Sequence, residues 1–122
     1  MDITFSGGSK MRAEIEKSYR IACLHEIPHY PPCSKEHTHE YEITVNVHAW
    51  VIEETGMVMD YNKMDEVINK YANKNLNDIF SIPSVENFAL AIADGIIAKL
   101  KHYSRVSVTI CESENTKVTI VR

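Results

Sequence analysis

The sequence lacks any apolar run long enough to cross a lipid bilayer. Its first twelve residues contain no apolar core of the kind that a secretion signal has. It has only three cysteines, an odd number at irregular spacing, which does not fit a disulfide framework. We therefore expect a protein of a reducing compartment, the cytoplasm, that has no membrane partner.

A surplus of positive charge is also missing. Thirteen Lys and Arg residues stand against seventeen Asp and Glu residues, which gives a net charge of -4. Proteins dedicated to nucleic acids usually carry a basic surplus, so we expect no nucleic-acid partner. At 122 residues, 44% of them hydrophobic, the chain has the size and the apolar content of one domain with a core of its own. We predict a single domain over residues 1–122.

Two segments alternate apolar and polar residues with the period of a β-strand. The first begins at residue 11 and ends near His25, and only Lys17 breaks its apolar parity. The second covers residues 40–51, where Trp50 stands on the otherwise polar face. Between them, residues 25–39 contain three prolines and no apolar period, which predicts an irregular loop.

The second half of the sequence predicts two helices and two further strands. Asp60 and Ser84 can each cap a helix, and apolar residues recur at helical spacing after both of them. Residues 106–110 and 118–120 alternate as strands around a turn at 114–116. This order predicts an α+β domain, an antiparallel four-stranded sheet with two helices on one face. The opposite face would need a cover, and self-association is the simplest one.

Three histidines indicate a metal site. His37 and His39 share the apolar side of the second strand, and His25 ends the first strand on its apolar parity. If the two strands pair as a hairpin, the three imidazoles meet at one end of the inner face. Three His ligands with an open fourth position are the pattern of a catalytic zinc site. The alternative is that these histidines are loop residues without a function. That alternative fits less well, because two of them share the inward face of a strand and the third ends another strand.

Cys33 lies four residues before His37. Near a metal cation the pKa of its thiol should fall, which would make the thiolate available as a base or nucleophile. Alternatively, Cys33 is the fourth ligand of a closed structural zinc site. The sequence alone leaves both interpretations open.

Glu112 continues the apolar parity of the third predicted strand. For a single glutamate, a solvated position past the end of the sheet is the commoner outcome. The functional alternative is a carboxylate that accepts two hydrogen bonds from a planar pair of N–H groups, such as the edge of an aminopyrimidinone.

Together these motifs resemble the 6-pyruvoyltetrahydropterin synthase / 6-carboxytetrahydropterin synthase family. The resemblance covers residues 19–120, and the order and spacing of the motifs are more specific than any one of them. The residues that carry it are Ile21-Ala-Cys-Leu-His25, Cys33-Ser-Lys-Glu-His37-Thr-His39, Gly56-Met-Val-Met-Asp-Tyr61, Leu76-Asn77, Pro83-Ser-Val-Glu-Asn87 and Glu112-Ser113.

The resemblance implies the tunnelling fold, in which subunits assemble into an oligomeric barrel, here a homohexamer, with active sites at the subunit boundaries. It implies a zinc-dependent lyase acting on 7,8-dihydroneopterin triphosphate, as 6-carboxytetrahydropterin synthase does in the queuosine (deazapurine) pathway. The site residues it implies are the zinc ligands His25, His37 and His39, the acid/base Cys33, and the pterin-binding residues Glu112 and Ser84.

The sequence departs from the family at one place that matters for catalysis. An Asp-His pair usually stands a few residues before Leu-Asn and completes a triad with the cysteine, whereas Ala72 and Asn73 stand here. Two alternatives to the lyase are therefore kept: a related aldolase-type enzyme that cleaves a pterin side chain, and a non-catalytic zinc- or pterin-binding homologue. The retained Cys33 and Glu112, with the three histidines, favour an enzyme.

Overall fold

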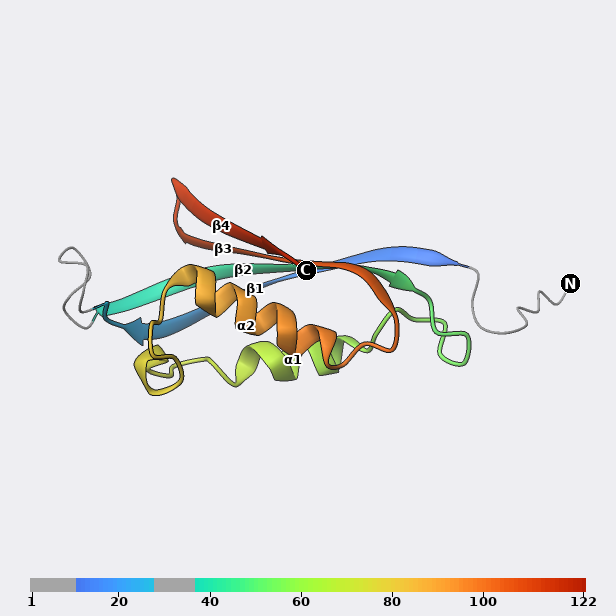
Figure 1. Ribbon diagram of the computed structural model, residues 1–122, viewed down its shortest axis with the longest axis horizontal. Coiled ribbons are helices and arrows are strands. Elements are labelled where there is room, and N and C mark those ends of the chain that lie inside the picture. Colours follow the sequence, from blue (N-terminus) through green and yellow to red (C-terminus); the bar gives the residue numbers. More distant parts are fainter. Residues whose placement is uncertain (1–10, 28–36) are drawn as a thin grey trace, which may run out of the picture.

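The computed structural model describes residues 11–27 and 37–122. Figure 1 shows a sheet of four strands with both helices on one side of it, which confirms the predicted α+β architecture. The elements are β1 (Arg12–His25), β2 (His37–Trp50), α1 (Tyr61–Asn69), the 3-10 turn η2 (Leu76–Asp78), α2 (Val85–Ile97), β3 (Tyr103–Ser113) and β4 (Thr116–Val121).

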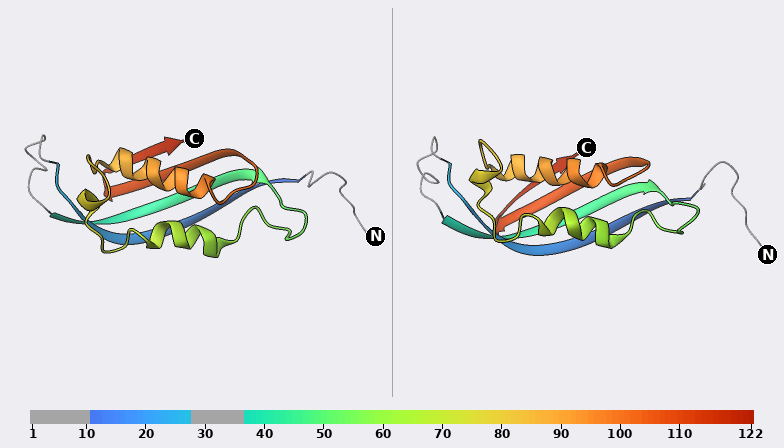
Figure 2. Two further views of the ribbon diagram at one scale, coloured as in Figure 1. Left: turned by 60° about the horizontal axis from the view of Figure 1, so that its bottom comes forward. Right: turned by 90° about the horizontal axis from the view of Figure 1, so that it is seen from below.

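The sheet is antiparallel throughout, in the order β1-β2-β3-β4. β1 and β2 have 14 residues each and pair over their whole length, from Arg12 opposite Trp50 to His25 opposite His37. Figure 2 shows the two strands, in blue and teal, side by side in the sheet. The predicted hairpin therefore exists, and it brings the beginning of β2 to the end of β1.

Strand alternation places the apolar side chains in one layer between the sheet and the helices. Each fully buried Val, Ile, Leu or Phe side chain contributes about 1.5–3 kcal/mol relative to an exposed one. The fully buried residues include Ile43, Val45 and Val47 of β2, Val106, Val108 and Ile110 of β3, Met64 and Ile68 of α1, and Phe88, Ile92 and Ile96 of α2.

Both helices begin at the predicted caps. The Asp60 carboxylate accepts a hydrogen bond from the backbone N–H of Asn62 at 2.8 Å, and the Ser84 hydroxyl accepts one from Asn87 at 3.1 Å. Such caps satisfy backbone donors that have no partner within the helix. No helix in the described ranges is long and apolar enough to span a membrane.

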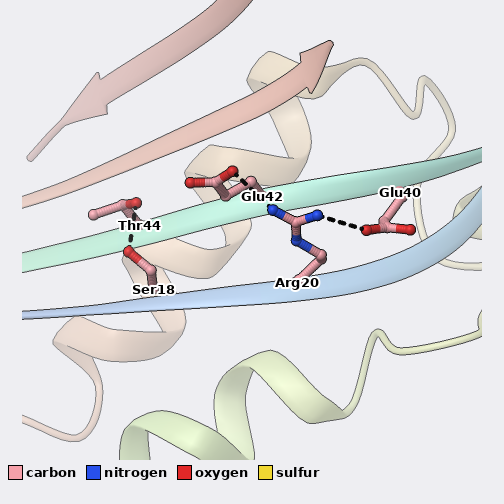
Figure 3. Close-up of polar contacts among 5 residues, drawn as sticks. All are labelled: Ser18, Arg20, Glu40, Glu42 and Thr44. Atoms are coloured by element: carbon pink, nitrogen blue, oxygen red, sulfur yellow. Dashed lines mark hydrogen bonds and ion pairs between the residues drawn. The ribbon is translucent and has the colours of Figure 1, made fainter. Parts of the chain in front are cut away.

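The sheet face away from the helices is polar. Figure 3 shows part of it: the hydroxyls of Ser18 and Thr44 lie 3.0 Å apart, and Arg20 pairs with Glu40 at 3.2 Å and with Glu42 at 3.4 Å. Cross-strand hydrogen bonds of this kind satisfy the side chains in contact with water. This face can therefore contact water, and it needs an apolar cover less than we expected from the sequence.

The connection from α1 to α2 follows the free edge of β1. The backbone N–H of Asn73 donates to the carbonyl of Ala22 at 2.7 Å, and that of Leu24 donates to the carbonyl of Lys74 at 3.0 Å. Asparagine is frequent in this segment, which contains Asn73, Asn75 and Asn77. Its backbone bonds hold the end of β1, where His25 stands.

Candidate active site

His25, His39 and Glu112 form a cluster at the end of the β1–β2 hairpin. One possible metal-binding atom from each of the three lies within 4.8 Å of the other two. The register that creates this proximity pairs Cys23 with His39 and His25 with His37. The structure thus brings together two of the three predicted metal ligands and sets the predicted pterin-binding glutamate beside them.

His25 is the buried member of the cluster, at 1% exposure. Its Nδ1 lies 3.0 Å from the backbone carbonyl oxygen of Pro83, which precedes α2. Because a carbonyl oxygen can only accept, Nδ1 carries the proton and donates it. In the neutral ring the lone pair is then on Nε2, which is the tautomer that metal-ligating histidines adopt when a carbonyl orients them.

His39 and Glu112 form the accessible side of the cluster. The His39 ring lies edge-on to that of His25, with 4.9 Å between centroids. Its Nε2 lies 3.6 Å from the Glu112 carboxylate, and both side chains are 29% exposed. A ligand from solvent can therefore reach these two residues, whereas His25 lies behind them.

Aromatic side chains form the inner wall behind the cluster. The Tyr41 ring is fully buried, with its centroid 5.6 Å from that of His39 and 5.5 Å from that of Phe88. The Tyr41 hydroxyl lies 3.4 Å from Nδ1 of His25. This rigid packing limits the movement of both imidazoles.

Glu112 occupies a β-bulge. Cys111 pairs with Lys117 and Ser113 pairs with Thr116, so Glu112 is the extra residue of β3. Glu112 stands two residues after the inward-facing Ile110, and its carboxylate lies 3.6 Å from Nε2 of His39. Glu112 is thus only partly solvated, not a strand end extended into water.

A hollow of about 330 Å³ adjoins Glu112 on the polar side of the sheet. The residues that line it are Arg20, Glu40, Glu42, Cys111, Glu112, Ser113 and Glu114. Glu112 therefore borders open space at the bulge.

Two predicted site features lie outside the described part of the chain. These are Cys33 and the side chain of His37, whose backbone stands opposite His25. Ser84 is described: its hydroxyl caps α2, one residue after the carbonyl that orients His25. The roles expected for these three residues therefore stay predictions.

The position of the missing Asp-His pair is a turn. Asn73 has a φ of 61°, a left-handed conformation that asparagine tolerates better than most residues. Its N–H is bonded to the carbonyl of Ala22, and Ala72 before it is half-buried. Neither side chain can accept and release a proton at neutral pH, so this turn cannot replace the relay.

Cys23 is a packing residue of the core. It is fully buried, and its thiol lies 3.2 Å from the carbonyl oxygen of Tyr71. Burial raises the pKa of the Cys23 thiol to about 11, which keeps it protonated and unreactive at neutral pH. Of the described cysteines, Cys111 is half-buried, and neither it nor Cys23 forms a disulfide.

Comparison with known proteins gives the same family by sequence and by structure. The family model described as 6-pyruvoyl tetrahydropterin synthase matches residues 14–122. A protein of Archaeoglobus fulgidus, provisionally named a 6-carboxy-5,6,7,8-tetrahydropterin synthase, is 32% identical over 95 residues, which cover 75% of this chain and 82% of that protein. The 6-pyruvoyl tetrahydrobiopterin synthase of Dictyostelium discoideum is 30% identical over 99 residues, 73% of each chain.

Solved structures show the same fold at lower identity. The 6-pyruvoyl tetrahydropterin synthase of Caenorhabditis elegans superposes with a TM-score of 0.70 at 18% identity, covering 90% of this chain and 95% of that one. The Plasmodium falciparum enzyme superposes with a TM-score of 0.66 at 16% identity, covering 91% and 98%.

Fold and sequence together define a pterin synthase-like lyase by class. The chain belongs to the 6-pyruvoyl tetrahydropterin synthase family. The resemblance noted in the sequence is thereby confirmed.

Proposed function

We propose that the chain is a zinc-dependent lyase that acts on 7,8-dihydroneopterin triphosphate, as a 6-carboxytetrahydropterin synthase of the queuosine pathway does. The observation that carries the proposal is the cluster itself: a buried imidazole with its Nδ1 on a carbonyl, next to a second imidazole and an accessible carboxylate. Family membership supports the pterin as substrate class.

The described residues fit a zinc-type metal. Neutral imidazoles are the commonest nitrogen ligands of zinc, and the carbonyl of Pro83 supports His25 as such a ligand. We propose that His25, His37 and His39 hold the ion, which would supply Lewis acidity toward a substrate oxygen. Burial of His25 and partial exposure of His39 would leave one side of the ion open to substrate.

Glu112 is proposed to bind the pterin ring. An ionised carboxylate accepts two parallel hydrogen bonds from the ring N–H and amino group of a pterin, and charge assistance makes such bonds stronger than neutral ones. The bulge holds Glu112 next to His39 and beside the hollow of about 330 Å³. We propose Ser84 as a second contact, because its hydroxyl accepts from Asn87 and keeps its own proton to donate.

Cys33 is the proposed acid/base that moves protons on the pterin side chain. A positioned group of this kind typically contributes about 10²–10⁴-fold to the rate. The turn at Ala72–Asn73 contains no titratable side chain, which favours two other candidate functions over the lyase. The second candidate is aldolase-type cleavage of a pterin side chain. A non-catalytic zinc- or pterin-binding homologue is the third.

The proposed assembly is a homohexamer built as a barrel. β1 and β4 are the edge strands of the sheet, and closing edges against neighbouring subunits removes unpaired backbone groups. The exposed apolar side chains Met11, Trp50, Tyr103 and Val121 lie on strands or next to one, where such contacts would form. The cysteines without a disulfide pattern favour the cytoplasm as compartment.

Incubation of zinc-loaded protein with 7,8-dihydroneopterin triphosphate, followed by mass spectrometry, separates the three functions. A 6-carboxytetrahydropterin product supports the lyase. A pterin shortened at its side chain supports the aldolase, and unchanged substrate that still binds supports the non-catalytic homologue. Protein freed of metal by a chelator is the control, and it should give no product.

A further inference from the structure

Asn77 binds the backbone of Glu26, the residue after His25, with both ends of its carboxamide. The N–H of Glu26 donates to Oδ1 of Asn77 at 2.8 Å, and Nδ2 of Asn77 donates to the Glu26 carbonyl at 3.0 Å. Since a backbone N–H only donates and a carbonyl only accepts, both groups require this orientation of the amide. The Asn77 carboxamide therefore pairs with Glu26 as the backbone of a residue in a neighbouring strand would.

Asn77 is itself held in place. Its backbone N–H donates to Oδ1 of Asn75 at 3.0 Å, which fixes the start of the η2 turn. Lys74 lies just before this turn, and its carbonyl accepts a hydrogen bond from the backbone N–H of Leu24 at 3.0 Å. The connection therefore already runs along the edge of β1. The carboxamide extends that pairing beyond His25, where β1 has ended.

The same connection also holds the His25 ring, through the carbonyl of Pro83. Two residues thus determine where His25 can point. Asn77 fixes the backbone immediately after His25, and Pro83 fixes the ring at Nδ1. If the end of β1 frayed, the ring would move away from Pro83 and from His39, whose ring centroid is 4.9 Å away.

We propose that Asn77 is a positioning residue of the metal site: it holds the end of β1 so that Nε2 of His25 is presented beside His39. The inference rests on the proposed zinc site. Groups that orient metal ligands from outside typically contribute about 10–100-fold to metal affinity. Asn77 acts on the backbone next to His25 and not on the imidazole itself, so we expect its loss to lower zinc affinity by about tenfold, the lower end of this range.

The first test measures zinc affinity by competition with a chelator, in protein of native mass and circular dichroism. Asn77→Ala should raise the zinc dissociation constant about tenfold. Asn87→Ala is the matched control, because Asn87 lies in α2 and its carboxamide donates at 2.8 Å to the Ile82 carbonyl of the same connection, not to the end of β1. An Asn77→Ala affinity within twofold of the parent, or an equal loss in Asn87→Ala, would overturn the proposal.

Asn77→Asp covers the case in which the alanine variant does not fold. It keeps the size and the accepting oxygen, but it sets a carboxylate oxygen against the Glu26 carbonyl where a donor stood. We expect a zinc affinity at least as low as for Asn77→Ala. Parent-like affinity in Asn77→Asp would contradict the need for that donor.

A second measurement needs no metal and so distinguishes this inference from the zinc proposal. In metal-free protein the Nδ1 proton of His25, held by Pro83, should give a slowly exchanging ring N–H resonance in NMR spectra. Asn77→Ala should lose this resonance and Asn87→Ala should keep it. If the parent binds no zinc, the proposed function fails, while this arm still decides the role of Asn77: persistence of the resonance in Asn77→Ala overturns it.

Discussion

Nδ1 of His25, at the end of β1, donates a hydrogen bond to the backbone carbonyl of Pro83, directly before the cap of α2, at 3.0 Å. The bond couples a candidate metal ligand to the start of the helix that packs on the sheet. Packing of α2 therefore helps to set the direction of the imidazole, and the site depends on the folded domain and not on the hairpin alone.

Glu112→Gln should weaken pterin binding at least tenfold, a loss of about 1.4 kcal/mol, because one accepting oxygen becomes a donor that faces an N–H group. Fold, oligomer and zinc content should not change. Pterin fluorescence titration measures the affinity. Glu114→Gln is the control, since Glu114 lines the same hollow but is exposed in the turn before β4. Equal affinities in the parent and in Glu112→Gln would mean that Glu112 does not bind the ring.

Cys33→Ala should keep zinc bound and lower turnover by about 10²–10⁴-fold, as expected for the loss of a general acid/base. Metal content and steady-state rate are measured on the same preparation. Cys111→Ala serves as a control, because Cys111 is half-buried on β3 next to Glu112 and has no proposed role. Loss of zinc in Cys33→Ala would instead identify the cysteine as a ligand of a closed site.

Asp65→Asn should destabilise the protein at neutral pH. The Lys17 ammonium, at 2.7 Å, and the Tyr19 hydroxyl, at 2.5 Å, donate to the Asp65 carboxylate and lower its pKa. Because the folded pKa lies below the unfolded one, this stabilisation is present above the ordinary Asp value and is lost as pH falls through the folded pKa.

Urea unfolding at neutral and at acidic pH measures this dependence. The stability difference between parent and Asp65→Asn should shrink as the pH falls below about 4, the ordinary Asp pKa. Glu66→Gln is the control, because Glu66 pairs with exposed Lys99 at 3.6 Å and is itself 67% exposed. A difference that stays constant with pH would show that the ion pair is not its source.

Sedimentation at micromolar concentration should give six times the chain mass of 13.9 kDa. Val121→Lys, a charge on edge strand β4, should shift the protein toward smaller species, because a lysine there disfavours pairing with another strand. Asn69→Lys adds the same charge at the exposed end of α1 and should leave the mass unchanged. A monomeric parent would contradict the barrel.

Alternation alone was enough to predict most of the sheet. β1, β2 and the buried face of β3 follow the parity of their apolar residues, and the hairpin pairs apolar residues of β1 with apolar residues of β2. Lys17 interrupts the apolar alternation of β1 because of a contact with a residue far away in the sequence. Its ammonium reaches Asp65 on α1, a residue 48 positions away in the sequence.

The supports of the site were not predictable in the same way. Pro83 holds His25 through its backbone carbonyl, and Asn77 binds the backbone of Glu26. A sequence pattern does not show which distant backbone group a side chain will contact. The bulge at Glu112 depends on the register with β4 and was also missed. What the sequence did predict was the inward direction of His25, His39 and Glu112, because all three share the parity of the apolar face.

Zinc content per chain tests the central claim most directly. Elemental analysis of the purified parent should give one zinc per chain, and His39→Ala should abolish it. His48→Ala is the matched control: its imidazole lies on the polar face, 3.6 Å from Glu14, and this variant should keep one zinc. Stoichiometric zinc that persists in His39→Ala, or a parent that binds none, would contradict a metal centre at the end of the hairpin.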